Sequence, residues 1–326
     1  MGRWPRRADA SPLQVNGPYL AIVSRGGVPE AGPPPNLAIG LIRALRPRQW
    51  VKNVLVVAAP LATLGGGSHY NYRDVFFEAG VAFVVFCMAA SSTYLINDAR
   101  DVHADRQHPT KRFRPIAAGV VSPSLAYLLA LGLAVAAVAI SASVSMALAL
   151  VTAIYLALQL GYNFGLKHIA VIDICIVSGG FLIRAVGGGV AAGVPLSQWF
   201  LLVMAFFSLF MAAGKRYAEL QLAERTGAKI RRALENYTGT YLRFVWTMSA
   251  TATVVFYGLW AFDRDHNSVS WFAASMIPIT IAVLRYAVDV DGGLAGEPEE
   301  IVLHDRVIQL MGGCWIAIMC AAINLE

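Results

Sequence analysis

The densest group of charged side chains lies in residues 97–115, directly after a long apolar segment. Asn97, Asp98, Asp101 and Asp105 come first. If the preceding helix continues through them, at about 100° per residue, their oxygen-bearing side chains fall within an arc of roughly 100°. Carboxylates on one face repel each other unless a cation joins them, and hard oxygen ligands suit Mg2+ better than zinc. The pattern predicts a Mg2+ site with these four ligands, of which the first three are the expected catalytic residues.

A run of cations follows the carboxylates. Arg106, Lys111, Arg112 and Arg114 are placed to hold the phosphate groups that a bound metal ion would bridge. The alternative interpretation is a solvated, charge-rich loop between two membrane helices. Surplus charge at the end of an apolar segment is costly, however, and commonly serves a function. We therefore expect the active site to form around this segment, with the four cations binding substrate.

The composition excludes an ordinary soluble enzyme. Hydrophobic residues make up 57% of the chain and charged residues 14%, with a mean hydropathy of +0.57. A soluble domain carries about a quarter charged residues. The sequence therefore predicts an all-α protein that crosses the membrane several times. Its net charge of +6 is not evidence for nucleic-acid binding, because the basic residues follow the membrane topology.

A helix that crosses a membrane takes about 20 apolar residues. With the N-terminus in the cytoplasm, Lys and Arg concentrate on the cytoplasmic side, and the outer loops hold only Arg73 and Arg264. We predict a multi-pass protein of the plasma membrane with a cytoplasmic active site. Residues 1–36 are expected to form a disordered cytoplasmic tail, and residues 37–326 one membrane domain. The nine candidate segments lie at about 48–64, 75–96, 123–141, 144–164, 169–192, 197–214, 241–262, 269–288 and 307–325.

Further polar residues stand at or inside the apolar segments. Lys52 and Asn53 lie where the first segment begins, and they either anchor it at the interface or reach a phosphate in a central cavity. Asp173 and Arg184 are about three helical turns apart and share one stripe. Ionisable groups inside an apolar helix need partners or water, so a structural ion pair is as well supported as a substrate contact. Glycines at 187–189 allow close helix packing or access for a bulky chain.

The acidic segment resembles a known motif. N-D-x-x-D-x-x-x-D begins at Asn97 and K-R-x-R-P-I-A-A-G begins at Lys111. Together they are similar to the first aspartate motif of the UbiA superfamily of intramembrane prenyltransferases, and the resemblance covers about residues 37–326. It implies a UbiA-like bundle of about nine transmembrane helices whose central cavity opens to the cytoplasm. It also implies that Tyr162 and Lys167, after the fourth apolar segment, contact substrate.

One position departs from the aromatic prenyltransferases of that superfamily. They carry a second aspartate-rich motif after the sixth segment, where this chain has Lys215, Arg216 and Glu219. Cations in place of metal-binding carboxylates suit an additional phosphate. The three residues resemble the phosphoribosyltransferase branch, whose donor, 5-phosphoribosyl 1-diphosphate, and lipid phosphate acceptor both bring extra phosphates. We therefore expect all three to bind substrate; the alternative is that the two cations form a basic cytoplasmic flank.

The resemblance implies an enzyme that transfers 5-phosphoribose to a polyprenyl phosphate and releases pyrophosphate, in the synthesis of cell-wall arabinan precursors. The acceptor of that branch is decaprenyl phosphate, and Mg2+ and membrane lipid are the other implied partners. Two alternatives stay open: an aromatic prenyltransferase with a polyprenyl diphosphate donor, and a lipid-phosphate transporter. The basic residues 215–216 argue against the first, and the nearly bare outer loops argue against the second. The oligomeric state is open, and a homo-oligomer is compatible with the sequence.

Overall fold

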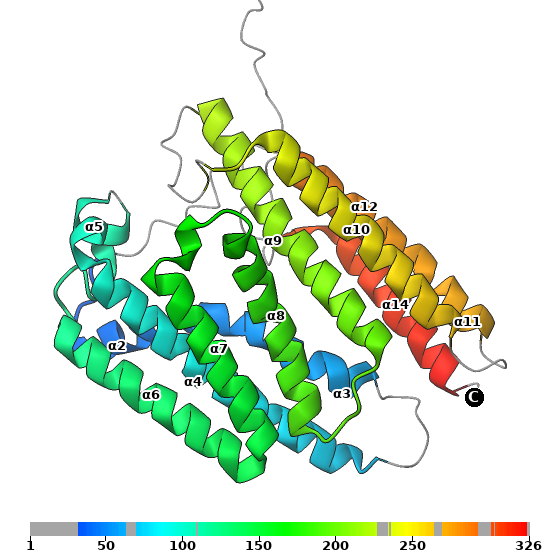
Figure 1. The fold of residues 1–326 in the computed structure, drawn as a ribbon, viewed down its shortest axis with the longest axis horizontal. Helices are drawn as coiled ribbons and strands as arrows, with labels where there is room; N and C mark the ends of the chain where they lie inside the picture. Colours follow the sequence, from blue (N-terminus) through cyan, green and yellow to red (C-terminus); the bar gives the residue numbers. More distant parts are fainter. Residues whose placement is uncertain are drawn as a thin grey trace, which may run out of the picture.

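The computed structural model is helical throughout the part of the chain that it describes, where no β-strand occurs (Figure 1). Residues 1–31 of the predicted tail lie outside that part. The described residues are 32–62, 70–108, 110–226, 234, 236–263, 269–292, 301–302 and 304–324.

The helices form one bundle, with short 3-10 helices, labelled η, among the α-helices. The first elements are α2 (Leu37–Leu45), η1 (Pro47–Val57), α3 (Ala58–Ala62), α4 (Tyr72–Arg100), α5 (Val102–Gln107) and η2 (Lys111–Phe113). They are followed by α6 (Pro123–Val144), α7 (Met146–Phe164), η3 (Leu166–His168), α8 (Ile172–Ala191) and α9 (Gln198–Thr226). The last are α10 (Gly239–Phe262), α11 (Val269–Ala274), α12 (Met276–Asp291) and α14 (Arg306–Asn324).

Seven helical stretches of the described residues are long and apolar enough to cross a membrane. They are α4, α6, α7, α8, α9, α10 and the stretch Trp271–Asp291, and they correspond to the second to eighth predicted segments. The first predicted segment folds as η1 and α3 instead of one long α-helix, and the ninth is α14, whose apolar stretch is shorter. The predicted all-α architecture is confirmed, whereas the predicted count of nine is not.

Glycines of α8 let neighbouring elements approach its backbone closely, and η1 is one of them. A Cβ atom at Gly188 would lie 1.7 Å from the carbonyl oxygen of Val56, and one at Gly187 would lie 2.4 Å from the ring of Phe86. The backbone of η1 therefore rests directly on the backbone of α8, as the close-packing interpretation of these glycines predicts. Runs of 3-10 helix longer than three or four residues are uncommon, and η1 extends over 11 residues.

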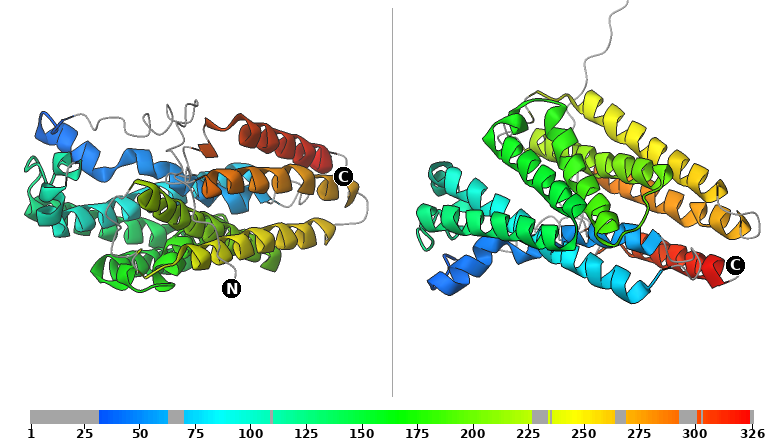
Figure 2. Two further views of the ribbon diagram at one scale, coloured as in Figure 1. Left: turned by 90° about the horizontal axis from the view of Figure 1, so that it is seen from above. Right: turned by 60° about the horizontal axis from the view of Figure 1, so that its bottom comes forward.

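Two apolar cores lie on either side of α8, which packs against both α7 and α9. One core, around Phe86 and Tyr155, joins η1, α4, α6 and α7. The other, around Phe210, Trp246 and Tyr286, joins α9, α10 and α12. The views in Figure 2 place α2 and η1 on the same side of the bundle as α14. The bundle thus has two halves joined by α8.

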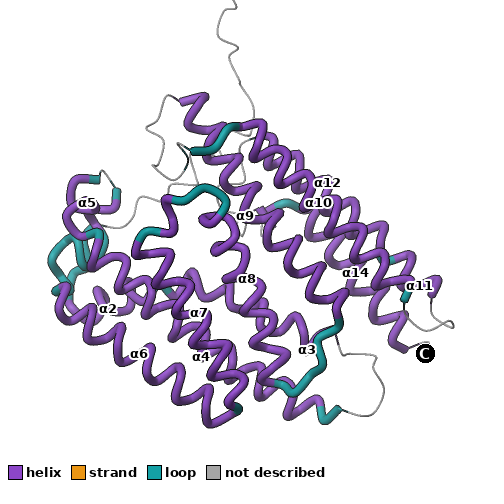
Figure 3. The backbone as a smooth tube through the Cα atoms, in the orientation of Figure 1, coloured by secondary structure: helices purple, strands orange, loops and turns teal. Residues whose placement is uncertain are grey.

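The described loops gather at the two ends of the bundle (Figure 3). α5, the α7–α8 connection and the end of α9 lie along one edge, at the upper left of Figure 1. The acidic segment is therefore at the same end of the bundle as the segments that carry Lys167, Asp173 and Arg216.

Candidate functional site

The C-terminal end of α4 carries the acidic segment. α4 stays helical through Arg100, and Asp101 then leaves the helix with φ −88° and ψ 10° before α5 begins. The backbone N–H of Asp101 donates to the carbonyl of Asn97, and that of Asp105 to the carbonyl of Asp101, at 2.9 Å each. The predicted continuous helix is therefore divided at Asp101 into α4 and α5, although i→i−4 backbone bonds run across the junction.

Asp98 is the centre of a group of ion pairs, the Asp98 cluster, formed by Arg46, Asp98, Asp105 and Arg114. Arg46 lies at the corner between α2 and η1, and its Nη2 donates to both carboxylate oxygens of Asp98 at 2.6 and 2.8 Å. Nη1 of Arg114 donates to Asp98 at 3.2 Å and to Asp105 at 2.7 Å. The Asp98 side chain is only 4% exposed. The two guanidinium groups therefore supply the positive charge that a buried carboxylate needs.

Asp101 is more open to solvent, with 34% of its side chain exposed. Nζ of Lys167, in η3, lies 3.6 Å from its Oδ2. The neighbouring Arg100 donates to the backbone carbonyl of Asn163, and its guanidinium lies 4.8 Å above the ring of Phe164. These contacts tie the end of α4 to the end of α7, and they bring the predicted residues Asp101 and Lys167 together.

The donor chemistry at this end of α4 suits a divalent cation. The carboxylates of Asp98 and Asp101 and the amide oxygen of Asn97 are hard ligands of the kind that Mg2+ takes. Within the described residues, however, no three side chains of His, Cys, Asp or Glu gather as a metal site. Arg46 donates to both carboxylate oxygens of Asp98, and Arg114 donates to Oδ2 of Asp105. The donor atoms of Asn97, Asp98 and Asp101 are of the type that Mg2+ takes, and the four ligand assignments stay predictions.

A second group, the Asp173 cluster, joins α7, α8 and α9 and consists of Tyr162, Asp173, Arg216 and Glu219. Arg216 donates from Nε and Nη2 to the two oxygens of Asp173 at 3.0 Å, and from Nη1 to Glu219 at 3.0 Å. Tyr162 donates its hydroxyl to Asp173 at 3.0 Å and accepts from Arg216 at 3.1 Å. Asp173 and Arg216 are 1% and 8% exposed. The structure brings these four predicted substrate contacts together and bonds them to each other.

The backbone just before Asp173 is held in a strained conformation. Val171 has φ 71° and ψ −51°, in a region that β-branched residues rarely adopt. Its N–H donates to the hydroxyl of Tyr237 at 2.7 Å. Burial raises the pKa of that hydroxyl, while the bond from Val171 opposes the rise. Tyr237 therefore stays neutral and holds the turn from which α8, with Asp173, begins.

Arg184 lies further along α8, about 16 Å from Asp173 at 1.5 Å per residue. It donates to the side chain of Asn53 at 2.6 Å, to the carbonyl of Gly180 at 2.6 Å and to the hydroxyl of Tyr155 at 2.8 Å. Arg184 and Asn53 are both buried. Their contacts cross-link η1, α7 and α8, which fits the structural alternative for Arg184, and a role of either residue in substrate binding stays a prediction.

The other predicted cations lie nearer the surface. Nε of Arg106 donates to the carbonyl of Ala117 at 3.0 Å. The guanidinium of Arg112 lies 4.8 Å above the ring of Phe113. Lys52, Lys111 and Lys215 are half-buried.

The matching family model is that of the UbiA prenyltransferase family, and it matches residues 54–293. The chain belongs to the UbiA prenyltransferase family. The predicted superfamily is thereby confirmed, and with its long apolar helices this UbiA chain is an integral membrane protein.

Three similar UbiA chains carry the name decaprenyl-phosphate phosphoribosyltransferase. The protein of Mycolicibacterium smegmatis is 67% identical over 92% of this chain and 98% of its own length. That of Mycobacterium tuberculosis H37Rv is 66% identical over 89% and 96%. That of Corynebacterium glutamicum is 58% identical over 90% and 89%. The similarity extends over nearly the whole of each relative.

Solved structures resemble the bundle at low identity. A UbiA homolog from Archaeoglobus fulgidus bound to GPP and Mg2+ has a TM-score of 0.65 at 15% identity, covering 87% of this chain and 99% of its own. A structure of digeranylgeranylglyceryl phosphate synthase has a TM-score of 0.63 at 15% identity, covering 89% and 99%. At this identity the likeness shows the fold alone.

Arg46 is the site residue that sequence reasoning missed. It has a left-handed backbone, with φ 54° and ψ 58°, although Gly is the residue that adopts this conformation freely. For other residues the left-handed region costs about 1–2 kcal/mol. The only sequence signal is its place in a basic stretch before Pro47, which indicates a corner but not a partner 52 residues away.

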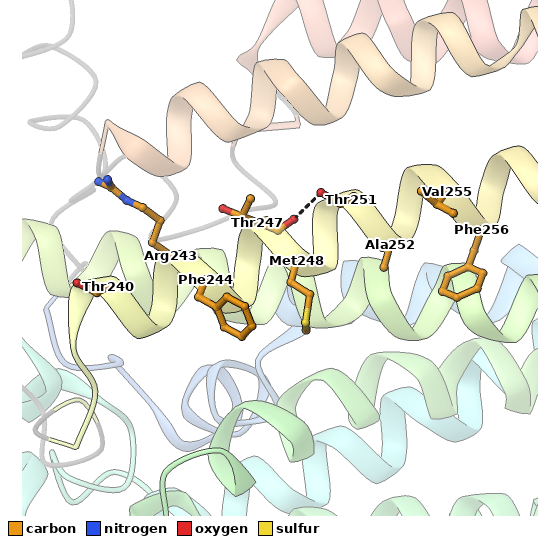
Figure 4. Close-up of a pocket in the computed structure, with 9 residues that line it drawn as sticks. All are labelled: Thr240, Arg243, Phe244, Thr247, Met248, Thr251, Ala252, Val255 and Phe256. Carbon is orange, nitrogen blue, oxygen red and sulfur yellow. Dashed lines mark hydrogen bonds between the residues drawn. The ribbon is translucent and has the colours of Figure 1, made fainter.

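A surface hollow of about 730 Å3 runs along α10, and none of its lining residues belongs to either cluster (Figure 4). Its apolar lining side chains include Phe244, Met248 and Val255, which are well exposed. A face of this kind on a membrane helix meets lipid chains, and we assign it no chemistry. The lining residues are Thr240, Arg243, Phe244, Thr247, Met248, Thr251, Ala252, Val255 and Phe256.

Proposed function

We propose that this UbiA chain transfers 5-phosphoribose from 5-phosphoribosyl 1-diphosphate to a polyprenyl phosphate, decaprenyl phosphate, and releases pyrophosphate. The observation that carries the proposal is the name shared by relatives that are 58–67% identical over nearly their full length. The mixed charge of the site supports it. Asp98 and Asp101 stand among Arg46, Arg114 and Lys167, as a site for a metal diphosphate requires.

The proposed reaction requires stabilisation of the charge on the leaving group and positioning of the two substrates. The bond between ribose C1 and the diphosphate oxygen breaks, and a phosphate oxygen of the lipid forms a new bond to C1 from the opposite face, inverting the anomeric centre. The lipid phosphate is an anion at neutral pH, so no proton has to be removed from it. The arginines and Lys167 around the end of α4 stabilise the negative charge that develops on the leaving pyrophosphate.

The proposed cofactor is Mg2+, held by Asn97, Asp98 and Asp101. When bound, it would neutralise charge on the leaving diphosphate. Oxygen-only donors support this choice, and the similar Archaeoglobus fulgidus UbiA homolog was solved with Mg2+. The chain's own part is to orient the diphosphate with Arg114 and Lys167.

The second cluster alters one expected role. Arg216 is committed to Asp173 and Glu219 by three hydrogen bonds of 3.0 Å. The additional phosphate is assigned to Lys215, the half-buried neighbour of Arg216, because the sequence places this second cation at the same end of α9. Tyr162 and Asp173 then position α7 and α8 around the site.

Orientation follows from the distribution of charge. We propose that the N-terminus and the edge with both clusters face the cytoplasm, because the basic residues of the chain concentrate there. The water-soluble donor enters from that side, while the polyprenyl chain lies in the hydrocarbon of the bilayer.

The decisive experiment offers two donors to the purified full-length protein in detergent with Mg2+. One reaction contains radiolabelled 5-phosphoribosyl 1-diphosphate and decaprenyl phosphate, and the other contains a polyprenyl diphosphate and 4-hydroxybenzoate. We expect label to enter the lipid phase from the sugar donor only. A prenylated aromatic product without sugar transfer would replace the proposal by the aromatic prenyltransferase alternative.

A further inference from the structure

Asp98 has two guanidinium partners that differ in how firmly each is held elsewhere. Arg114 is anchored by Asp105 at 2.7 Å and lies farther from Asp98, at 3.2 Å. Arg46 contacts both oxygens of Asp98, at 2.6 and 2.8 Å, and its guanidinium also lies 5.0 Å above the ring of Tyr94. A cation bound to Asp98 would take from Arg46 the carboxylate that it contacts, whereas Arg114 would keep Asp105. Arg46 is therefore the guanidinium that needs a new anionic partner once Asp98 is occupied.

The position of Arg46 also allows it to turn. Its side chain is 26% exposed, whereas that of Asp98 is 4% exposed. It stands at a corner, between the end of α2 and Pro47, and not inside a helix. The backbone there is left-handed, a conformation in which Gly would be unstrained. Strain that is retained at a non-Gly residue points to a use of its side chain.

We propose that Arg46 exchanges partners during the reaction: it holds the carboxylate of Asp98 until a metal diphosphate binds, and then turns to the diphosphate. The exchange keeps charge balanced at each stage, because Asp98 passes from a guanidinium to a metal ion while the guanidinium passes from a carboxylate to a phosphate. Arginine suits both partners, since its planar fork matches carboxylate and phosphate oxygens. Arg46 is thus a substrate-binding residue that also competes with the metal.

This inference rests on the proposed function only in that a diphosphate is bound. Inorganic pyrophosphate is the leaving group whether the donor is a sugar or a prenyl diphosphate. It is therefore the probe, and the outcome does not depend on which donor the enzyme uses.

The test compares Arg46→Gly and Arg46→Gln with wild type in two binding measurements on the full-length protein. Arg46→Gly relieves the backbone strain, so that loss of the guanidinium is not confounded by misfolding. The first measurement is Mn2+ affinity without any phosphate, from the free-Mn2+ signal in electron paramagnetic resonance. The second is pyrophosphate affinity at saturating Mg2+, from calorimetry. Arg43→Gln is the matched control. It removes another arginine from the C-terminal end of α2, and Arg43 donates to the carbonyl of Gly32 and not to Asp98.

We expect opposite signs in the two measurements. Both Arg46 variants should bind Mn2+ several-fold more tightly, because a competitor is gone, and bind pyrophosphate at least about tenfold more weakly, because a charged hydrogen-bond partner is gone. Arg46→Lys should recover part of the pyrophosphate affinity, and Arg43→Gln should alter neither value. Mn2+ affinity unchanged in both Arg46 variants, or pyrophosphate affinity unchanged, would overturn the exchange. Failure of sugar transfer alongside these expected affinities would remove the proposed function and leave the exchange standing.

Discussion

Two arginine–aspartate clusters lie at one edge of the bundle, and they are built differently. In the Asp98 cluster, Arg46 comes from a backbone corner and is 26% exposed. In the Asp173 cluster, Arg216 comes from the interior of α9, is 8% exposed and donates to Asp173, Glu219 and Tyr162. A guanidinium beside water can change partners, whereas one enclosed by several acceptors loses bonds that water does not replace. The same pairing of arginine and aspartate therefore allows a change of partners in the Asp98 cluster and cross-links helices in the Asp173 cluster.

The largest effect should come from removing metal, and it should reach one cluster only. Chelation with EDTA should reduce phosphoribosyl transfer to background, and added Mg2+ should restore it. The unfolding temperature should change little, because the Asp173 cluster satisfies its charges with protein groups. Transfer that persists in EDTA would contradict a metal role at the end of α4.

Breaking the Asp173 cluster should cost stability. Asp173→Asn leaves the buried Arg216 without a charged partner at that position, and removing one partner of a buried pair costs about 3–5 kcal/mol. The free energy of unfolding in detergent would measure the loss. In the double variant Asp173→Asn with Arg216→Gln, part of the stability should return, and strictly additive losses would show that the two residues are not coupled.

Breaking the Asp98 cluster should cost activity more than stability. Asp98→Asn should lower kcat/KM by about 10²–10³-fold, the loss typical of a group that stabilises developing charge. The matched control is Asp263→Asn, which removes an exposed carboxylate that accepts from Trp199 at 2.7 Å. Near-normal transfer by Asp98→Asn, with the control also active, would contradict the catalytic role assigned to Asp98.

The smallest effect separates two neighbours in α9. Lys215→Asp should raise KM for donor or acceptor at least about tenfold, as expected for loss of a charged hydrogen bond to phosphate. Its unfolding temperature should stay near that of wild type, whereas Arg216→Gln should lower it. Wild-type kinetics in Lys215→Asp would favour the basic-flank interpretation.

Much of the architecture is readable from short stretches of sequence. Apolar runs such as 123–141 and 144–164 predict α6 and α7 closely, because helices in lipid must satisfy their backbone bonds within the segment. The first segment escaped this reasoning. Its backbone lies against α8 at Gly188, where the missing side chain lets the carbonyl of Val56 approach. The hydropathy of a segment does not predict a contact with a residue so far away in the sequence.

The candidate site likewise has residues that the sequence predicts and partners that it does not. Asp98 and Asp101 stand out because charge after an apolar run is costly wherever the chain goes. Their partners do not stand out: Arg46 meets Asp98 across 52 residues, and Arg216 meets Asp173 across 43. The arginine between Asp98 and Asp105 does not stand out either, because Arg114 lies beyond both of them in the chain.

The sequence by itself determined the class of the protein, its family and the acidic segment at the centre of the site, because each of these is written in neighbouring residues. Only the tertiary structure decided which cation meets which carboxylate, that Arg184 is a buried cross-link, and that Arg46 belongs to the site. The physical reason is the distance along the chain over which each kind of interaction acts. Hydropathy and helical spacing act within a few turns, whereas the pairing of charges depends on how whole helices pack, and here that packing turns on contacts as local as Gly188 against Val56.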